Sequence, residues 1–142
     1  MKYHFKIHKE QSGYWAECIE LDGLNTQGDT LEKLRSNMHE ALHLFLDEED
    51  DSDVLFKMPK KNLKGKNIEQ VPVAPRLALA VMLRVLRKKN HFTQKQMAEL
   101  IGLKGLFSYQ RLENAKTANP EWDTLSKIKK VFPELDLDDL AA

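Results

Sequence analysis

The sequence predicts an α+β protein in which a small N-terminal β-sheet with one packed helix is followed by an all-α domain of the helix-turn-helix type. Three observations predict this class. The first residues alternate between apolar and polar with the period of a strand, while later apolar residues recur at helical spacing. The net charge also changes sign between these two parts. We therefore divide the chain into a first domain at 1–58, a linker with a short strand at 59–75 and a helical domain at 76–142.

The overall composition sets limits on the class of protein. The 142 residues leave room for one ordinary domain or two small ones, and 42% hydrophobic with 31% charged residues is typical of a globular chain. Because the sequence has neither a long uncharged apolar run nor a signal-peptide pattern, we expect a cytoplasmic protein without a membrane partner. The single cysteine, Cys18, excludes an internal disulfide and a multi-cysteine zinc site.

A formal net charge of zero hides a strong asymmetry along the chain. Residues 1–53 carry five basic and thirteen acidic side chains, a net charge of −8, which includes an acidic run at 47–53. Residues 54–67 carry five lysines and no acid, and residues 76–130 carry twelve basic against four acidic side chains, a net charge of +8. The basic block favours a phosphate-bearing partner, and the acidic block favours a basic protein.

The N-terminal residues predict a β-hairpin. Three apolar residues alternate with polar ones and give the period of a half-buried strand. They are Tyr3, Phe5 and Ile7. The polar side of this strand holds His4 and His8, which we expect to be exposed. A turn at 11–13 leads into a second strand at 14–21.

A helix is predicted after a short loop or third strand that lies between two Asp/Gly pairs. Thr30 is a suitable N-cap, and an acidic residue follows it in the first turn. The apolar residues of this helix form one face. They are Leu31, Leu34, Met38, Leu42 and Phe45. Residues 54–58 predict a further strand.

The lysine-rich segment that follows predicts a linker with one short strand at 68–73. Pro75 suits the first turn of the next helix, which we expect to end near Asn90. Its inward face is formed by Leu79, Leu83 and Leu86.

The residues from Thr93 onwards predict a helix-turn-helix. Thr93 is a good N-cap, Ala98 is small where a second helix must cross closely, and Gly102 permits the positive φ of a tight turn. The inward residues of the first helix are expected to be Met97, Leu100 and Ile101. In the second helix Tyr109 and Leu112 are expected to be buried. Three residues of that helix face outward: Ser108, Gln110 and Arg111.

A last helix is expected to close the helical core and to end before Pro133. Its core residues are Trp122, Leu125, Ile128 and Val131. The second helix of the pair would then be able to enter the major groove of DNA. A helical bundle without a nucleic-acid role is the alternative for this part of the chain.

Residues 76–132 resemble the Cro/repressor-type helix-turn-helix family. The motifs are Thr93-Gln94, the triplet at 111–113 (Arg-Leu-Glu) and the Asn-Pro pair at 119–120. The resemblance implies that Gln94 binds phosphate and that the third helix reads bases. The residues expected to contact double-stranded operator DNA are Thr93, Gln94, Lys95, Lys104, Phe107, Ser108, Gln110, Arg111 and Lys116.

The spacing departs from the family pattern at one point. The stretch from Gly102 to Arg111 is one residue longer than usual. This leaves the start of the recognition helix and the assignments at 104–108 open. Phe107 is accordingly either a core residue or a contact to a thymine methyl group.

Residues 3–46 resemble the HicB-type antitoxins. The motif is Gly13-Tyr-Trp-Ala, then Leu-Asp22-Gly, then Thr-Gln-Gly-Asp-Thr at 26–30, with Asp22 in place of the common proline. Lys33 and Leu34 replace the usual Glu-Ala. The resemblance implies a degenerate ribonuclease H-like fold that binds and inhibits a HicA-type toxin, a basic ribonuclease that cleaves mRNA. It also implies repression of the protein's own operon by a homodimer or higher oligomer.

The resemblance, together with the acidic charge, predicts a toxin-binding surface. Its candidates are Tyr14, Trp15, Glu17, Glu20, Asp22 and Asp29. Each carboxylate is equally well explained as a solvated strand or loop end. We expect no catalytic residue, metal or cofactor, and therefore a protein that is not an enzyme.

Three alternatives remain open at this point. His39 to His43 matches the H-E-x-x-H zinc pattern, although no third ligand follows at a family spacing. Glu17, Asp22 and Asp29 would form a Mg²⁺-binding nuclease centre if they converged. The chain would otherwise be a stand-alone transcriptional repressor whose N-terminal domain senses a small ligand.

Overall fold

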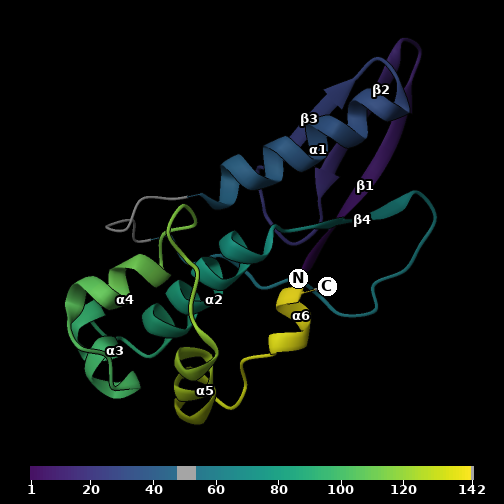
Figure 1. Cartoon of the computed structure of the whole chain (residues 1–142). Helices are drawn as coiled ribbons and strands as arrows, with labels where there is room; N and C mark the ends of the chain where they lie inside the picture. The colour runs from purple at the N-terminus through teal and green to yellow at the C-terminus, as the bar shows by residue number, and fades with distance from the viewer. Residues whose placement is uncertain (48–53, 142) are drawn as a thin grey trace. The chain divides into compact units, whose positions relative to one another are not determined.

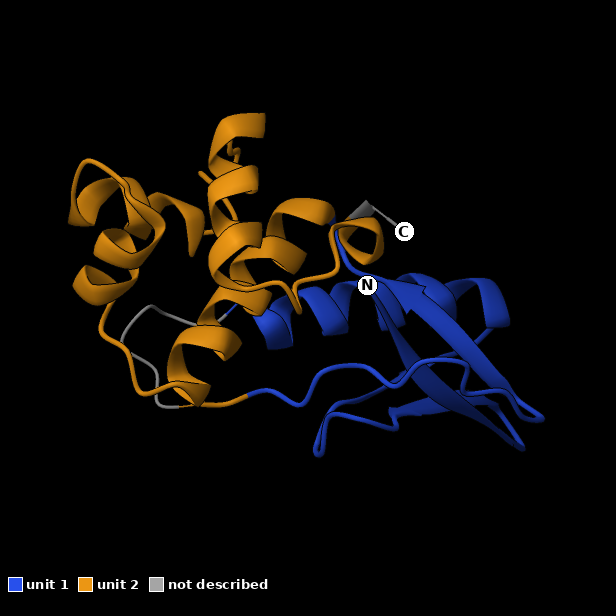
Figure 2. Ribbon diagram, turned by 90° about the horizontal axis from the view of Figure 1, so that it is seen from below, with its two compact units in different colours: residues 1–48, 56–74, 142 blue, residues 49–55, 75–141 orange. Residues whose placement is uncertain are grey.

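A computed structural model of the chain describes residues 1–47 and 54–141, and these form two compact units (Figure 2). The first, called the β unit below, contains residues 1–47 and 56–74, and the second, the helical unit, contains 54–55 and 75–141. This is the α+β class that the sequence predicts. The first unit extends past residue 58 because part of the expected linker joins its sheet. Most of the acidic run at 47–53 lies outside the described residues.

The β unit contains a four-stranded antiparallel sheet in the order β3-β2-β1-β4 (Figure 1). Its strands are β1 (Lys2–Glu10), β2 (Gly13–Cys18), β3 (Asn25–Gly28) and β4 (Ile68–Pro72). The predicted hairpin is confirmed, with a second strand that ends at Cys18 rather than at 21. The strand predicted at 54–58 is wrong, because Val54 and Leu55 are exposed and pair with no sheet edge.

One helix, α1 (Leu31–Leu46), covers one face of this sheet (Figure 1). Thr30 caps it as predicted, because the Thr30 hydroxyl accepts a hydrogen bond of 3.0 Å from the backbone N–H of Lys33. The buried stripe is Leu34, Met38, Leu42 and Leu46. Leu31 and Phe45, which the pattern placed in this stripe, are half-buried instead. The stripe follows the i+4 spacing, which keeps it on one narrow line along the helix.

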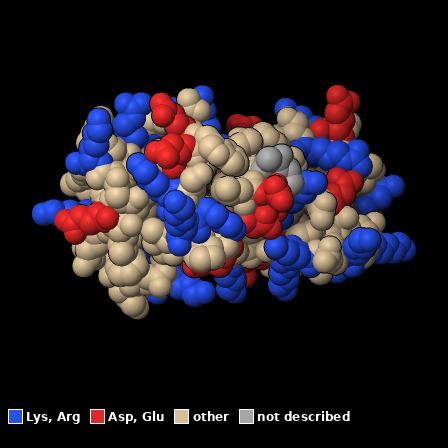
Figure 3. All heavy atoms as spheres, turned by 60° about the horizontal axis from the view of Figure 1, so that its bottom comes forward, with Lys and Arg blue, Asp and Glu red and all other residues tan. Residues whose placement is uncertain are grey.

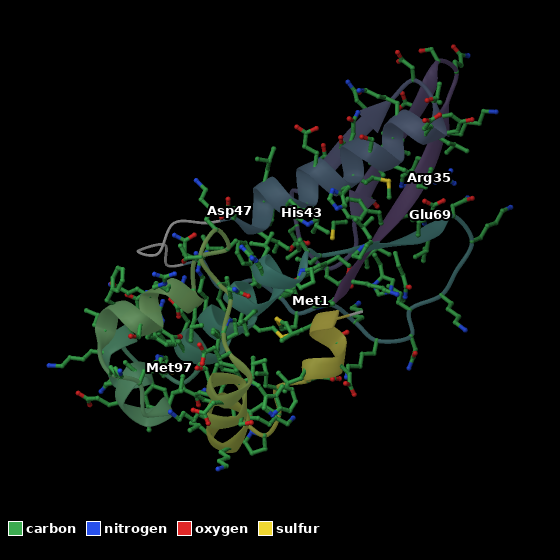
Figure 4. The ribbon with its side chains drawn as sticks, in the orientation of Figure 1. Met1, Arg35, His43, Asp47, Glu69 and Met97 are labelled. Carbon is green, nitrogen blue, oxygen red and sulfur yellow. The ribbon has the colours of Figure 1, made fainter. Side chains whose placement is uncertain are left out.

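An ion pair joins α1 to the edge strand β4. The Arg35 guanidinium binds the Glu69 carboxylate with two nitrogens, with Nη2–Oε1 at 2.7 Å and Nε–Oε2 at 3.0 Å (Figure 4). The hydrogen bond from Arg35 lowers the pKa of the Glu69 carboxyl, although burial opposes the shift. Glu69 pairs with Phe5 across the strands, so it lies on the helix-covered face.

The prediction that His4 is exposed is wrong. His4 is 1% exposed, its Nδ1 lies 2.7 Å from Glu20 Oε2, and its backbone N–H donates to Glu20 Oε1 at 2.9 Å. Glu20 also accepts a hydrogen bond of 3.0 Å from the backbone N–H of Lys60. The segment after Phe56 therefore helps to bury His4 on the sheet face opposite α1. The polar–apolar alternation of one strand cannot predict burial by residues that are more than fifty positions away in the sequence.

The helical unit is formed by α2 (Pro75–Lys89), α3 (Gln94–Ile101), α4 (Leu106–Leu112), α5 (Trp122–Val131) and α6 (Leu137–Ala141). Its fully buried core includes Leu83, Met97, Tyr109 and Ile128. The predicted bounds of α2 are confirmed, whereas α6 was not predicted.

Two residues predicted to be in the helical core are exposed. Trp122 is 76% exposed at the first position of α5, and Leu100 is 46% exposed on α3. Met97, Ala98 and Ile101 already fill the buried stripe of α3, so Leu100 has no core position left to occupy. No helix in the described part of the chain is long and apolar enough to cross a membrane.

Candidate nucleic-acid interface and acidic surface

The α3–turn–α4 segment is fixed by local hydrogen bonds. Thr93 Oγ1 accepts from the Gln96 backbone N–H at 3.1 Å, while Gln96 Oε1 accepts from the Thr93 N–H at 2.8 Å. This reciprocal pair is a capping box, which satisfies two backbone donors that the helix leaves free. At the other end, Gly102 has φ +83° and its N–H donates to Ala98 O at 3.1 Å. The sequence predicted both ends of α3.

The start of α4, which the sequence left open, is at Leu106. Gly105 precedes it with extended backbone and makes no side-chain cap bond. The additional residue of this segment is therefore accommodated in the turn at 102–105, and Phe107 falls in the first turn of the helix. Tyr109 and Leu112 are buried, as predicted.

A buried carboxylate connects three helices of this unit. Glu113, just past the end of α4, is 0% exposed. Its Oε1 accepts a hydrogen bond of 2.7 Å from Arg87 Nε of α2 and one of 2.5 Å from the Tyr109 hydroxyl. Its Oε2 accepts a hydrogen bond of 2.8 Å from Gln94 Nε2 of α3. Arg84 Nη2 donates to the Glu113 carbonyl at 2.6 Å. We call this set the Glu113 cluster.

The shifted pKa values follow from this arrangement. Burial and the adjacent Glu113 charge both raise the pKa of the Tyr109 hydroxyl, so the hydroxyl remains a proton donor at all ordinary pH values. Burial is the largest single influence on Arg87 and lowers its pKa, but the hydrogen bonds and charges of Glu113 and Tyr109 together outweigh it and raise the pKa. The hydrogen bonds of the cluster hold α2, α3 and α4 in one arrangement.

Gln94, expected to bind phosphate, makes two hydrogen bonds within the unit. It donates to Glu113, and its Oε1 accepts from Gln110 Nε2 at 3.2 Å. Gln110, like Ser108, is half-buried rather than fully outward. The other expected DNA contacts are exposed: Thr93, Lys95, Lys104, Phe107, Arg111 and Lys116.

The outer surface of α4 presents an aromatic ring beside a cation. Phe107 is 70% exposed, which decides that it is not a core residue. The Arg111 guanidinium carbon lies 5.9 Å from the centre of the Phe107 ring. Arg111 also borders a hollow of about 400 Å³. The polar residues around this hollow include Lys104, Ser108, Thr117, Thr124 and Lys127.

Lysine and arginine do not form one continuous patch on the face drawn in Figure 3, where acidic side chains are interspersed among them. Around the hollow beside α4, three cations (Lys104, Arg111 and Lys127) face one exposed acid, Glu121, and Glu113 is buried and already paired. The local charge suits a phosphate-bearing ligand.

The uncovered face of the β unit carries part of the predicted acidic surface. Trp15 stacks on His8 with ring centres 4.1 Å apart, and Glu17 Oε1 lies 3.6 Å from His8 Nε2. The strand register explains this group, because His8 pairs with Trp15 and Lys6 with Glu17. Tyr14 pairs with Lys9 and points to the opposite, helix-covered face.

The remaining carboxylates do not join this group. Glu20, a predicted partner contact, is 3% exposed and occupied by His4, so it is a structural residue. Asp22 is exposed in the loop between β2 and β3, whereas Asp29 is exposed beyond the other end of β3. Glu17, Asp22 and Asp29 do not converge as a nuclease centre would require. Within the described residues, no three His, Cys, Asp or Glu side chains gather around a common point.

The two histidines of the zinc-like pattern are used structurally. Their rings stack 4.0 Å apart on α1, and the two nitrogens of His43 have protein partners. His43 Nε2 accepts from the Ala74 backbone N–H at 3.0 Å, which makes Nδ1 the donor to the His39 carbonyl at 2.8 Å. Burial and the adjacent His43 lower the pKa of His39. No lone pair of His43 is left for a metal.

Two contributors to these surfaces were missed from the sequence. His8 was expected to be exposed, but it is half-buried, because strand pairing places it against Trp15. Lys127 of α5 lies beside the hollow next to Arg111, sixteen residues away along the chain. The hairpin register was a usable signal for His8. No sequence pattern indicated that Lys127 would lie beside Arg111.

No family model matches the chain. A segment of 39 residues, 28% of the chain, is 38% identical to the UPF0150 protein ssl0738 of Synechocystis sp. (strain ATCC 27184 / PCC 6803 / Kazusa) and covers 54% of that protein. The chain therefore spans about half the length of the curated relative that it matches.

Proposed function

We propose that the protein is a HicB-type antitoxin whose β unit binds and inhibits a HicA-type, mRNA-cleaving toxin and whose helical unit represses its own operon. The observation that carries the proposal is the combination, in one chain, of the β unit with a helix-turn-helix that exposes Arg111 and Phe107. The partial identity to a UPF0150 protein is compatible with a HicB-like antitoxin.

The DNA-binding part of the proposal rests on the exposed side of α4. A helix with its side chains is about 10–12 Å across, which fits the major groove at about 12 Å. The buried residues Tyr109 and Leu112 hold the opposite side of α4 in the core, so its outer side is free to meet base edges. Lys95, Lys104 and Lys116 are exposed at positions suited to phosphate contacts.

Arg111→Ala tests this part. We expect it to weaken binding of the full chain to its own promoter DNA by roughly 1–3 kcal/mol, about five- to 150-fold, without reducing toxin neutralisation. Arg76→Ala is the matched control, because Arg76 is an exposed arginine of the same unit outside the helix-turn-helix. Fluorescence anisotropy at several salt concentrations measures both. Full affinity of Arg111→Ala at physiological salt would refute the placement of α4 on DNA.

The toxin-binding part rests on the open face of the sheet. Trp15 offers a large aromatic surface of the kind that is enriched at protein interfaces, and Glu17 adds a negative charge. Asp22 extends the acidic character beyond the end of β2. A basic ribonuclease must expose cations to hold RNA, so acidic groups are able to occupy the same surface. A homodimer would present two helical units to a two-fold operator.

Co-expression with the adjacent small open reading frame is the deciding experiment. We expect that gene product alone to stop growth, and this protein to restore growth and to co-purify with it. Charge reversal of Glu17 and Asp22 to Lys should abolish rescue but leave promoter binding intact. Glu32→Lys with Glu40→Lys is the control, because both residues are exposed on α1. A harmless neighbouring gene product would exclude the antitoxin role and favour a repressor that senses a ligand.

A further inference from the structure

The outer side of α4 combines two recognition elements that face the same way. Phe107 and Arg111 are four residues apart, so they lie one turn apart on the same side of the helix. Both are exposed, and the guanidinium carbon is 5.9 Å from the ring centre. An exposed phenyl ring has no role in the core of this unit, and Tyr109 and Leu112 already supply the buried side of α4.

These two side chains match two chemical groups of the major groove. An arginine binds guanine with two hydrogen bonds, to O6 and N7, and a phenylalanine makes apolar contact with the thymine methyl group. The thymine methyl group and the O6 and N7 of guanine both face the major groove, so a neighbouring thymine and guanine present both groups to one side of a helix. Successive bases of a strand are about 3.4 Å apart. Because the guanidinium lies only 5.9 Å from the ring centre, a methyl group one base step away from the guanine would meet the ring from the side rather than between the two groups.

We infer that Phe107 and Arg111 together read a 5′-TG-3′ step in each half of the operator, with Arg111 on the guanine and Phe107 on the thymine methyl group. The inference rests on the proposed DNA-binding function and specifies its ligand. The occupant is DNA rather than a protein because cations outnumber acids here: Lys104, Arg111 and Lys127 border the adjacent hollow against one exposed acid, Glu121, and Glu113 is buried. The ring beside the guanidinium also excludes water from the methyl contact.

The first measurement is selection of binding duplexes from a randomised 30-base-pair DNA library by the full chain. The selected half-sites should share a TG step, which appears as CA on the complementary strand. The thymine of that step is then replaced by deoxyuridine, which removes only the methyl group. We expect wild-type affinity to fall about fourfold, the value for one buried methyl group. Replacement of the guanine by 7-deazaguanine, which removes the N7 acceptor but keeps O6, should cause part of the roughly five- to 150-fold loss expected for the complete two-bond contact.

Variants assign the contacts to each side chain. Phe107→Ala should bind the thymine and deoxyuridine duplexes equally, while Phe107→Leu should retain part of the difference. Trp122→Ala is the matched control, because it removes an exposed aromatic side chain of the same unit outside α4 and should keep the fourfold difference. Phe107 is 70% exposed, so its replacement should leave the far-ultraviolet circular dichroism spectrum unchanged.

Two kinds of failure are distinguishable. If selected duplexes bind tightly but share no TG step, or if wild type binds thymine and deoxyuridine duplexes equally, the base assignment is overturned and DNA binding stands. If selection yields no duplex above non-specific binding, the proposed repressor function is overturned together with the inference. Loss of toxin neutralisation by Phe107→Ala, with DNA binding intact, would assign this surface to the toxin and also overturn it.

Discussion

Replacement of Glu113 by alanine should destabilise the helical unit severely. Glu113 is 0% exposed and Arg87, its partner, has 11% of its side chain exposed, so the substitution leaves a charged guanidinium almost buried without its carboxylate. Loss of one member of a buried pair costs about 3–5 kcal/mol. At roughly 0.05–0.15 kcal/mol per residue, residues 75–141 have only about 3–10 kcal/mol of stability in total. We therefore expect this unit to be partly or wholly unfolded in Glu113→Ala.

Hydrogen exchange measured by mass spectrometry distinguishes unfolding of the helical unit alone from destabilisation of the whole chain. Peptides from α3 and α4 should lose protection in Glu113→Ala, while peptides from β1 and β2 keep it. Urea unfolding of the full chain supplies the free energy. The double variant Arg87→Met with Glu113→Leu fills the same space with apolar groups and should recover most of the lost stability, because no charge is left buried.

Two results would refute this reasoning. A loss of less than about 1 kcal/mol in Glu113→Ala would mean that water reaches Arg87 and that the pair is worth no more than a surface ion pair. If the double variant were destabilised as much as Glu113→Ala, the loss would come from disturbed packing around Tyr109 and not from an unpaired buried charge.

Three further predictions concern other elements. Gly28→Ala should cost about 1–3 kcal/mol in urea unfolding, because the new Cβ would lie 2.6 Å from Leu34 N, whereas Gly105→Ala, with open space around it, should change stability by less than about 0.5 kcal/mol. Thr93→Ala should cost about 0.5–2 kcal/mol through loss of the capping box, and Thr93→Ser should cost less. Burial raises the pKa of the Cys18 thiol from 9.0 to about 11, so iodoacetamide should modify it roughly a hundredfold more slowly than in the urea-unfolded chain at pH 8. Because the folded state then holds this proton more tightly than the unfolded state, stability should fall as pH rises from about 9 towards 11; equal alkylation rates in both states would contradict the burial.

The elements that the sequence predicted well are those whose signals are local. Thr30 and Thr93 were predicted as N-caps and Gly102 as a turn, because each acts on residues within a few positions. The helix-turn-helix followed from these signals and from the spacing of apolar residues. The exposure of Phe107 did not, since an additional residue in the turn shifts the helix by about 100° and leaves either side of α4 possible.

The features that the sequence did not predict depend on contacts between distant segments. His4 belongs to a polar alternation that normally faces solvent, but Glu20 and the backbone of Lys60 cover it. Glu20 was assigned to the partner surface for the same reason, because a carboxylate near a strand end is usually exposed. These contacts join residues far apart along the chain, so no local pattern indicates them.

The Glu113 cluster couples the stability of the helical unit to its proposed recognition of DNA. Helix α4 has seven residues, too few to be stable alone, so its direction depends on Tyr109, Leu112 and the carboxylate that holds Tyr109 against α2 and α3. If only a fraction of molecules has α4 in place, the apparent dissociation constant rises by the inverse of that fraction. Variants of the cluster should therefore lose operator affinity only as their stability approaches zero. Arg111→Ala should lose it at full stability, and this difference separates a residue that orients the recognition helix from one that reads the base.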